Sequence, residues 1–486
     1  MQGNVGVIEL GSNSLRFVVF SGNSSYPSVL YSEKVPCELG KALDDTARLE
    51  PSARALVLPA VIRFFQLAKN MNLEKLEVIA TAAIREAVDG AELVEEIAEK
   101  TGLVVRVLSC KDEGCLSAYA VTVDYPNASG VVVDLGGASM EMTHIQKGEV
   151  KASFSVAVGL LRLMESRDSE SVLETKVHRL IEEVVSKLSL KDSVGSIYLI
   201  GGAFKAFARV CLVATNSPLR VTHYYSLTSD ALRLHLKNFS DRSDRNNILD
   251  SASAKDKKKI PTAVYIVKKL LEIINPDTVL FSNFGVREGL FCNVSHFDRN
   301  REDGLLSRCA QLENTYARFP GFGFELFTWL QPILDQNISA ERLVQACCLL
   351  CNTAWSKHRP QSIHWFWGLL DSVELGGINH TERMVMLSIL AKQVGGNSDL
   401  CLLGNRYNIT PEGPALRVIV RAIRLGKELA GGASGILKLC SLVVEQEKLV
   451  LVFSSAEIEG LKSAEVLKRL QSLAKSMKLV GVIDVS

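Results

Sequence analysis

Two segments far apart in the chain share a pattern that constrains the fold more than any other feature. Residues 5–20 consist of an apolar, β-branched run, a turn of Gly, Ser and Asn, and a second apolar run. Residues 130–145 repeat this order around a Gly-rich turn at 136–139. Apolar runs of this length bounded by turn residues predict β-hairpins. A chain that contains the same hairpin twice is predicted to fold as two similar halves.

The segments between and after the hairpins alternate between strand and helix patterns, which is typical of a layered α/β domain. Strands are predicted at 76–81, 103–108, 196–200 and 278–282, and helices at 51–70, 90–101, 168–189 and 261–274. The polar stretch 238–256 is predicted to be a surface excursion rather than a domain linker.

The pattern changes near residue 300, where strand signals become rare and helical spacing dominates. Helices are predicted at 338–356, 381–393 and 413–430, followed by a βαβ-like tail of a strand at 449–453, a helix at 463–477 and a strand at 479–485. A length of 486 residues exceeds one hydrophobic core, so about three domains are expected. We place them at 1–126, 127–300 and 301–486.

Composition excludes several classes of function. The chain has 55 Lys and Arg against 54 Asp and Glu, so no net field draws it to nucleic acid or to an anionic membrane. No stretch reaches the roughly 18 apolar residues of a membrane span, and the start lacks the pattern of a signal peptide. The 11 cysteines show no paired metal spacing, which favours reduced thiols in a cytoplasmic, soluble protein.

The turns of both hairpins carry short donors beside flexible backbone. A turn of this kind can direct several N–H groups and hydroxyls into one concavity, which forms an anion site. An ordinary hairpin turn is the alternative for either turn alone, but two such turns behind strands that end in an acid favour a phosphate clamp. The candidate residues are Gly11, Ser12, Asn13, Ser14, Gly136, Gly137, Ala138 and Ser139.

Three acids flank the turns. Glu9 and Asp134 end the strands before the turns, and Glu141 lies in the strand after the second turn. Carboxylate oxygens are the ligands that Mg²⁺ prefers, and hydrolysis of a phosphoanhydride needs a cation to offset phosphate charge. Solvated strand-end carboxylates are the alternative interpretation. We expect these acids to hold Mg²⁺.

The motifs resemble those of the exopolyphosphatase and guanosine pentaphosphate phosphohydrolase family. The segments that carry the resemblance are 7–16 and 132–141 (the two phosphate motifs), 79–87, 107–114, 158–163, 199–203 and 284–290. The resemblance covers essentially the whole chain. It implies an α/β fold of two actin-like (ribonuclease H-like) ATPase-superfamily domains, followed by an α-helical HD-related domain.

The resemblance also implies roles for single residues. Arg85 lies in the segment whose Arg contacts substrate phosphate, and Glu113 takes the place of the general base. Gly201 and Gly202 correspond to the adenosine motif of the superfamily. The implied activity is Mg²⁺-dependent release of terminal phosphate from inorganic polyphosphate, by a homodimer without nucleic-acid or membrane partners. Guanosine pentaphosphate is the alternative substrate, and a sensor of polyphosphate or nucleotide without turnover is the alternative of a different class.

Some positions depart from the family pattern. Glu9 stands where Asp is usual, Ala138 replaces a Gly and Met140 replaces a Thr. If position 138 required a positive φ, Ala would be strained there. Gly114-Cys115 replaces the common Ala-Arg after the base, so a cation that faces phosphate is expected to be missing.

A lysine run at 255–259, followed by Lys268 and Lys269, is either a solvated face or a cationic track for polyphosphate. We expect the third domain to be catalytically silent and to extend substrate binding and dimer contacts, because the chain contains no His-Asp dipeptide. Residues too scattered to replace that pair are His358, His364 and Asp371. Residues expected in the core or in an interface are Cys347, Cys348, Cys351, Trp355, Trp365 and Trp367.

Overall fold

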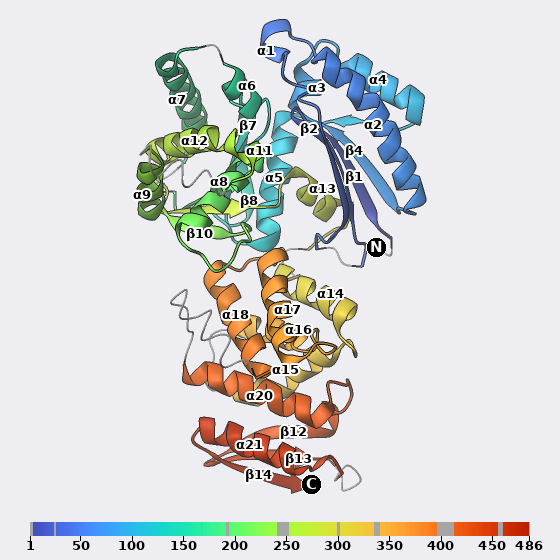
Figure 1. The fold of residues 1–486 in the computed structure, drawn as a ribbon, viewed down its shortest axis with the longest axis vertical. Coiled ribbons are helices and arrows are strands. Elements are labelled where there is room, and N and C mark those ends of the chain that lie inside the picture. Colours follow the sequence, from blue (N-terminus) through green and yellow to red (C-terminus); the bar gives the residue numbers. More distant parts are fainter. Residues whose placement is uncertain are drawn as a thin grey trace. The chain divides into compact units, whose positions relative to one another are not determined.

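A computed structural model shows two compact units, unit 1 at Met1–Gly304 and unit 2 at Leu305–Ser486 (Figure 1). It describes residues 3–23, 26–166, 168–190, 194–240, 252–298, 302–334, 341–395, 413–454 and 460–485. Among these residues, no helix is both long and apolar enough to cross a membrane. The three-part division at 126 and 300 stays a prediction.

The first sheet of unit 1 has the order β3-β2-β1-β4-β5. Its strands are β1 (Val5–Leu10), β2 (Ser14–Phe20), β3 (Val29–Pro36), β4 (Lys75–Ala80) and β5 (Arg106–Val107). Strand β1 is almost completely buried, which is why Glu9 is the only charged residue in its sequence. It pairs antiparallel with β2 and parallel with β4.

The second sheet has the order β10-β11-β9-β6-β7-β8. Its strands are β6 (Gly130–Leu135), β7 (Met140–Gln146), β8 (Glu149–Val156), β9 (Ser196–Ile200), β10 (Tyr225–Thr228) and β11 (Thr278–Ser282). Strands β8, β7 and β6 are antiparallel neighbours, and β9 then pairs parallel with β6. Strands β3, β2, β1 and β4 of the first sheet are arranged in the same way. The predicted duplication of the hairpins is confirmed in the strand order of both sheets.

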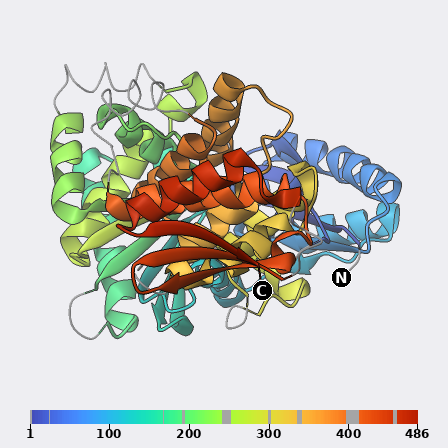
Figure 2. The same cartoon turned by 90° about the horizontal axis from the view of Figure 1, so that it is seen from below.

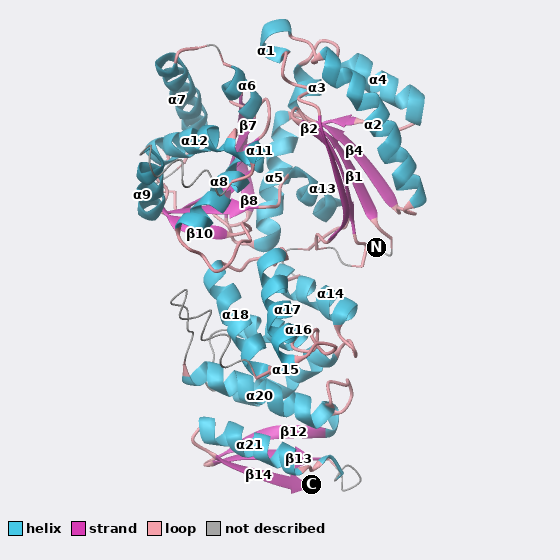
Figure 3. Cartoon of the chain, in the orientation of Figure 1, coloured by secondary structure: helices cyan, strands magenta, loops and turns pink. Residues whose placement is uncertain are grey.

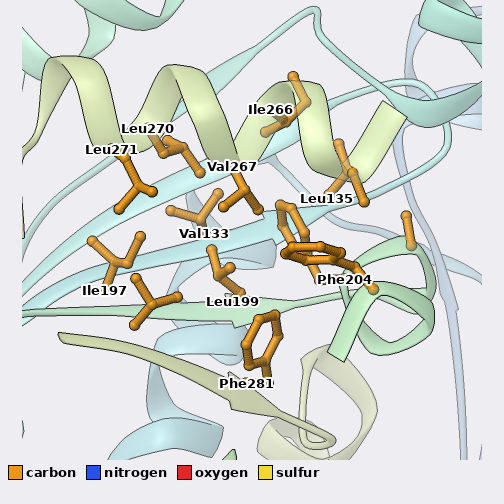
Figure 4. Packing of buried hydrophobic residues seen from close by; sticks show 14 of the residues in the cluster. Val133, Leu135, Ile197, Leu199, Phe204, Ile266, Val267, Leu270, Leu271 and Phe281 are labelled. Atoms are coloured by element: carbon orange, nitrogen blue, oxygen red, sulfur yellow. The ribbon is translucent and has the colours of Figure 1, made fainter. Parts of the chain in front are cut away.

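Helices cover both faces of each sheet (Figure 3). The helices of unit 1 that bear on the site are α2 (Pro51–Asn70), α3 (Ala82–Glu86), α4 (Gly90–Thr101), α5 (Cys110–Asp124), α6 (Leu160–Glu165), α7 (Glu170–Lys187), α8 (Gly202–Ala214), α12 (Ile260–Ile273) and α13 (Val286–Val294). Side chains of α2 and α4 pack on one face of the first sheet. In the second sheet, α12 and α8 place Val267, Leu270 and Phe204 against Val133 and Leu199 (Figure 4).

Helices α5 and α13 each pack against the sheet of the other half of unit 1. Helix α5 follows the first sheet in sequence, yet Ala118 and Val121 pack against Val132 of the second sheet. Helix α13 follows the second sheet, yet Leu290 and Phe291 join the core of the first sheet. Helix α5 also contributes Ala120 and Val123 to the core of the first sheet, so it packs against both sheets.

Most predicted elements of unit 1 are confirmed, with ends that shift by a few residues. The predicted strand 103–108 is an exception, since only Arg106–Val107 pairs in the sheet. Helix α5 was not predicted, because it is buried around most of its circumference and so shows no amphipathic stripe. The segment 238–256 is described only at its two ends, where α9 (Ser229–Ser240) and α11 (Ala254–Lys257) lie.

Unit 2 is helical and ends in a small sheet, as predicted (Figure 2). Its helices are α14 (Gly304–Tyr316), α15 (Phe322–Leu334), α16 (Glu341–Leu350), α17 (Arg359–Ser372), α18 (His380–Gln393), α20 (Pro414–Ala430) and α21 (Ala464–Ser476). Its strands are β12 (Cys440–Glu445), β13 (Lys448–Phe453) and β14 (Val480–Val485). Strands β13 and β14 are parallel, which confirms the βαβ tail, and β12 adds an antiparallel strand.

The side chains singled out in unit 2 do not form a metal site among the residues described. His358 precedes α17, and His364 lies on α17 with Nδ1 2.8 Å from the Pro360 carbonyl oxygen. Cys347, Cys348 and Cys351 are buried, as expected for core residues, and burial raises the pKa of each thiol.

The tryptophans of unit 2 were expected in the core or in an interface, and the interface alternative stays a prediction. Trp365 packs edge-on against Tyr316, with ring centroids 4.9 Å apart. Trp355 is 53% exposed, so it is not a core residue.

Candidate functional site

The two Gly-rich turns have the same backbone geometry. The Gly11 N–H donates to the Ser14 carbonyl (3.2 Å), and the Gly136 N–H donates to the Ser139 carbonyl (2.9 Å). A Cβ at Gly11 would lie 3.0 Å from the Ser14 carbonyl oxygen, and one at Gly136 would lie 3.1 Å from that of Ser139. Both turns therefore favour glycine at the same position for the same steric reason.

The carbonyl groups of both turns are held by the segment that follows the third strand of each sheet. The Ser12 oxygen accepts from Gly40, and the Asn13 oxygen accepts from residues 37 and 38. The Gly136 and Gly137 oxygens accept from the first residues of α6. In a trans peptide the next N–H points opposite to the carbonyl. The N–H groups after these carbonyls therefore point away from those segments, and they are the candidate donors of the predicted anion site.

The turns meet face to face. A Cβ at Gly137 would lie 2.9 Å from Ser12 Cβ and 3.1 Å from the Asn13 nitrogen. Ala138 is 1% exposed, and its methyl group belongs to the core of the first sheet. Its φ is not in the left-handed region, so the strain considered for Ala at this position does not occur. The second turn thus rests on the first half of unit 1.

A cavity of about 210 Å³ lies where the turns meet. Predicted site residues that line it are Glu9, Gly11, Ser12, Asn13, Ser14, Glu113, Asp134, Gly136, Gly137, Ser139, Gly201 and Gly202. Ala138, Glu141 and Arg85 are not among its lining residues. Arg85 and Glu141 lie behind the wall, where Arg85 contacts the lining residue Glu113 and Glu141 contacts the lining residue Ser139.

Glu113 lies in the first turn of α5, whose N-terminus is capped by Ser109. Arg85 Nη1 donates to Glu113 Oε2 (2.9 Å) and to the Leu108 carbonyl (2.8 Å). Arg85 Nη2 is buried without a hydrogen-bond partner. Burial, and then the charge of Glu141, raise the pKa of Glu113 well above its usual value, while Arg85 opposes the shift. The arrangement combines a carboxyl group that titrates above its usual range with a spare guanidinium donor.

Asp134 and Glu141 face each other across the second hairpin. Ser117 on α5 donates to Asp134 Oδ2 (2.5 Å). Ser139 and Ser155 donate to Glu141 Oε1 at 2.7 and 2.9 Å. Burial, and then the charge of Glu9, raise the pKa of Asp134 to about 6. Burial, and then the charge of Asp134, raise the pKa of Glu141 to about 7.

The wall also carries basic residues. They are Lys259 of the lysine run and four that were not singled out, Arg16, Lys34, Lys205 and Arg287. Arg287 forms an ion pair with Glu9, although the two residues lie near opposite ends of the sequence of unit 1. Burial, and then the charges of Arg16 and Lys259, lower the pKa of Lys34 to about 8. Arg16 and Lys34 lie opposite each other in the adjacent strands β2 and β3, and this pairing is seen only in the structure.

The lysine run contributes only one residue to this wall. Lys259 lines the cavity, whereas Lys255 and Lys258 are exposed. Lys269 is buried in ion pairs with Glu174 (2.6 Å) and Glu272 (3.0 Å), so it is engaged away from the cavity.

A buried polar group supports one side of the cavity. Asn283 lines the wall, and its backbone N–H donates to His223 Nδ1 (3.1 Å). His223 Nε2 lies 3.2 Å from Asp124 Oδ2, without the alignment of a hydrogen bond. Tyr26 donates to the other oxygen of Asp124 (2.7 Å). Asp124 ends α5, so the helix that carries Glu113 also contacts this support.

Comparison with known proteins identifies the family. Residues 18–296 match the Ppx/GppA phosphatase family, which is more than half of the chain. The chain belongs to the Ppx/GppA phosphatase family.

Similar proteins include members of both branches that the family name joins. Over 162 residues the chain is 25% identical to Exopolyphosphatase 1 of Mycobacterium leprae (strain TN), and the match covers 33% of this chain and 48% of that protein. The chain thus spans about half the length of that relative. It is 21% identical to guanosine-5'-triphosphate,3'-diphosphate pyrophosphatase of Vibrio parahaemolyticus, over 93% of this chain and 92% of that protein.

The fold is also shared with a solved structure of the family. The Aquifex aeolicus PPX-GPPA enzyme matches at a TM-score of 0.51 and 24% identity, covering 60% of this chain and 99% of that chain. This likeness supports a mixed α/β fold, and the actin-like assignment stays a prediction.

The acids of this Ppx/GppA site suit a hydrated cation. Among the described residues, no three carboxylate, His or Cys side chains converge as a ready cage. Mg²⁺ usually keeps several waters and takes one or two carboxylates beside substrate phosphates. Asp134 is raised in pKa by burial and by a neighbouring acid, and a cation would relieve both effects. The donor set therefore fits Mg²⁺ held mainly through water and substrate.

The departures from the family pattern have structural reasons. Cys115 does not line the cavity, so a basic side chain there is not required by this wall. A Cβ at Gly114 would overlap Ser153 Oγ and would lie 2.7 Å from Thr143 Oγ1. Glycine at 114 therefore allows α5 to approach the second sheet closely. Met140 is fully buried in the core of that sheet.

Proposed function

We propose that this chain is a phosphoanhydride hydrolase that releases terminal phosphate from inorganic polyphosphate. The observation that carries the proposal is the position of Glu113 in a cavity that both Gly-rich turns line. One turn supplies anion-binding backbone from each half of the unit, and the carboxylate lies where a water molecule could be activated. Membership of a phosphatase family supports the same reaction class.

Glu113 acts as general base in the proposed reaction. Its carboxylate takes a proton from water while the water oxygen forms a bond to the terminal phosphorus. The bond from that phosphorus to the bridging oxygen breaks, and the shortened chain leaves with the bridging oxygen. The raised pKa of Glu113 suits this role, because a base is most effective when its pKa is close to the working pH.

Arg85 and the two turns stabilise the charge on the transferring group. Arg85 lies behind the cavity wall, where Glu113 and the Leu108 carbonyl anchor it and Nη2 has no partner, so we propose that Nη2 donates to a phosphoryl oxygen once substrate is bound. The N–H groups of the turns are oriented before substrate binds, so little reorganisation is needed when charge develops.

Mg²⁺ is the proposed cation, and when bound it offsets the negative charge of the phosphates. Asp134 borders the cavity and is the proposed direct or water-mediated ligand, whereas Glu9 also borders the cavity but is paired with Arg287. Glu141 supports Asp134 from behind and is connected to the turn through Ser139.

The lining charges support a polyanionic substrate. Five basic residues line the cavity against the three acids Glu9, Glu113 and Asp134.

Guanosine pentaphosphate is the second candidate substrate. It is favoured by the similarity of nearly the whole chain to a relative named for that nucleotide. The part of the wall formed by Gly201, Gly202 and Asn283 is the proposed place for a nucleoside.

The homodimer, the cytoplasmic location and the HD-related nature of unit 2 stay predictions.

The test measures phosphate release with Mg²⁺ from long polyphosphate, guanosine pentaphosphate and ATP. We expect release from polyphosphate and a loss of about 1,000-fold in Glu113→Gln, because a base and its ion pair are removed together. Asp112→Asn is the matched control, since Asp112 shares the first turn of α5 but is exposed.

Each outcome of this test has a distinct meaning. Equal rates for native protein and Glu113→Gln would contradict the role of Glu113. Faster release from guanosine pentaphosphate would favour the second substrate. No release from any substrate, together with tight polyphosphate binding, would instead favour a sensor.

A further inference from the structure

Helix α6 contacts the second phosphate turn at its N-terminus. The N–H groups of Leu160 and Leu161 donate to the carbonyls of Gly136 (2.9 Å) and Gly137 (2.8 Å). A Cβ at Gly159 would overlap the backbone of Ala138, so the chain enters the helix in close contact with the turn. The position of α6 is therefore tied to the position of this turn.

Arg162 extends from the same helix to the other half of unit 1. Its Nη2 donates to Glu86 Oε2 (2.6 Å), and its Nε lies 3.0 Å from Asp44 Oδ1 without the alignment of a hydrogen bond. The Arg162 side chain is 14% exposed, whereas Asp44 is 62% and Glu86 is 36% exposed. A largely buried guanidinium depends on its partners more than an exposed one does. Glu86 makes the aligned contact.

Glu86 is the last residue of α3, and α3 carries the proposed catalytic contacts. Ala82 lines the cavity, and the Ala83 N–H donates to Ser12 Oγ of the first turn (3.2 Å). Arg85, adjacent to Glu86, makes the 2.9 Å contact with Glu113. A helix of five residues has few internal hydrogen bonds, so its orientation depends on such outside contacts.

We propose that Arg162 is a positioning residue, which holds α3 through Glu86 so that Arg85 faces Glu113 and the substrate phosphate. The inference rests on the proposed function of this site. Arg162 connects the second turn, through α6, to the first turn and to the catalytic pair, through α3. A shift in either half would otherwise change the distance between the turns and Arg85, and errors near 1 Å can cost about 100-fold in rate.

The two partners of Arg162 provide a matched pair of variants. Glu86→Gln and Asp44→Asn each remove one negative charge from the same guanidinium. Only Glu86 lies on α3, whereas Asp44 lies on α1 (Leu43–Thr46), which carries none of the proposed catalytic residues. A positioning role predicts unequal effects. A simple ionic clamp between the halves predicts similar effects.

Kinetics with polyphosphate form the first test. We expect Glu86→Gln to lower kcat about 10-fold or more with a smaller change in KM, because the lost alignment acts on the reacting group. Asp44→Asn should change kcat less than about 2-fold, as expected for an exposed ion pair. Arg162→Lys should keep more activity than Arg162→Gln, since Lys retains the charge without the fork. Equal losses in Glu86→Gln and Asp44→Asn, or no loss in Glu86→Gln, would overturn the proposal.

Hydrogen–deuterium exchange is the second test, and it does not depend on activity. We expect faster exchange in residues 82–87 of Arg162→Gln and Glu86→Gln, with β6 and α5 unchanged and Asp44→Asn like the native protein. A uniform increase across unit 1 would show loss of overall stability and would overturn the positioning role. If the native protein releases no phosphate, the proposed function fails, while this exchange experiment still decides whether Arg162 orders α3.

Discussion

The two hairpins of unit 1 have the same backbone and different charges. Strands β1 and β2 pair Glu9 with Arg16, whereas β6 and β7 pair Asp134 with Glu141 at the equivalent position. Glu9 is also neutralised by Arg287, while Asp134 has Ser117 and a neighbouring acid. The first hairpin is therefore charge-balanced, whereas the second holds two acids with raised pKa. Under the proposed function, the first hairpin is the anion side of the cavity and the second is the cation side.

Neutralising the cation side should have the largest effect. In Asp134→Asn we expect phosphate release to fall about 100-fold or more, because the cavity loses its proposed cation ligand. Without Mg²⁺ at pH 8, the melting temperature should rise by about 2 to 4 °C, since a buried anion is removed. Asp230→Asn, an exposed acid of the same half, is the control. Full activity of Asp134→Asn would contradict the division of roles.

The same acids set the pH dependence of stability without Mg²⁺. The pKa values of Asp134 (about 6) and Glu141 (about 7) in the folded protein lie above their ordinary values. The folded state therefore binds these protons more tightly than the unfolded state does. Their contribution to the free energy of unfolding is complete below about pH 4 and is lost as the pH rises through 6 to 7. Melting curves with and without Mg²⁺ should differ most above pH 7.

The next effect concerns the contact between the hairpins. Gly137→Ala places a Cβ 2.9 Å from Ser12 Cβ, so the two turns must separate. We expect kcat/KM to fall about 10-fold, since both turns are proposed to bind one phosphate end. Gly195→Ala, where a Cβ meets nothing within 4 Å, controls for the loss of a glycine. Native rates in Gly137→Ala would show that the turns act independently.

A smaller effect should distinguish the two charge patterns by pH. The Glu141 anion raises the pKa of Glu113, so Glu141→Gln should lower it and keep the base ionised to lower pH. We expect the acidic limb of kcat/KM to move to lower pH. Arg16→Gln, at the equivalent position of the first hairpin, should change KM and leave that limb in place. A shift toward higher pH in Glu141→Gln would contradict the electrostatic argument.

The smallest effect tests how the second turn rests on the first half. Ala138→Gly removes a fully buried methyl group from the core of the first sheet and adds backbone freedom. We expect unit 1 to lose about 1 kcal/mol of unfolding free energy, measured by denaturant titration. An unchanged or higher stability would mean that Ala138 does not anchor the turn.

Local patterns predicted a large part of the site. The hairpins, their turns and the acids at the strand ends follow from apolar runs and turn residues that are adjacent in sequence. Glu113 required the family resemblance, because α5 has no amphipathic stripe from which its helix could be predicted. The support formed by Asp124, His223 and Asn283 had no sequence signal, since its members are isolated polar residues in apolar surroundings.

The sequence by itself determined the repeated hairpins and the chemistry of each turn, because strands and turns depend on neighbours within a few residues. Only the tertiary structure decided which charges meet. Arg287 reaches Glu9 across 278 positions, and Arg162 reaches Glu86 across 76. Such pairs depend on how the two halves of unit 1 pack together, and no local pattern of residues contains that information.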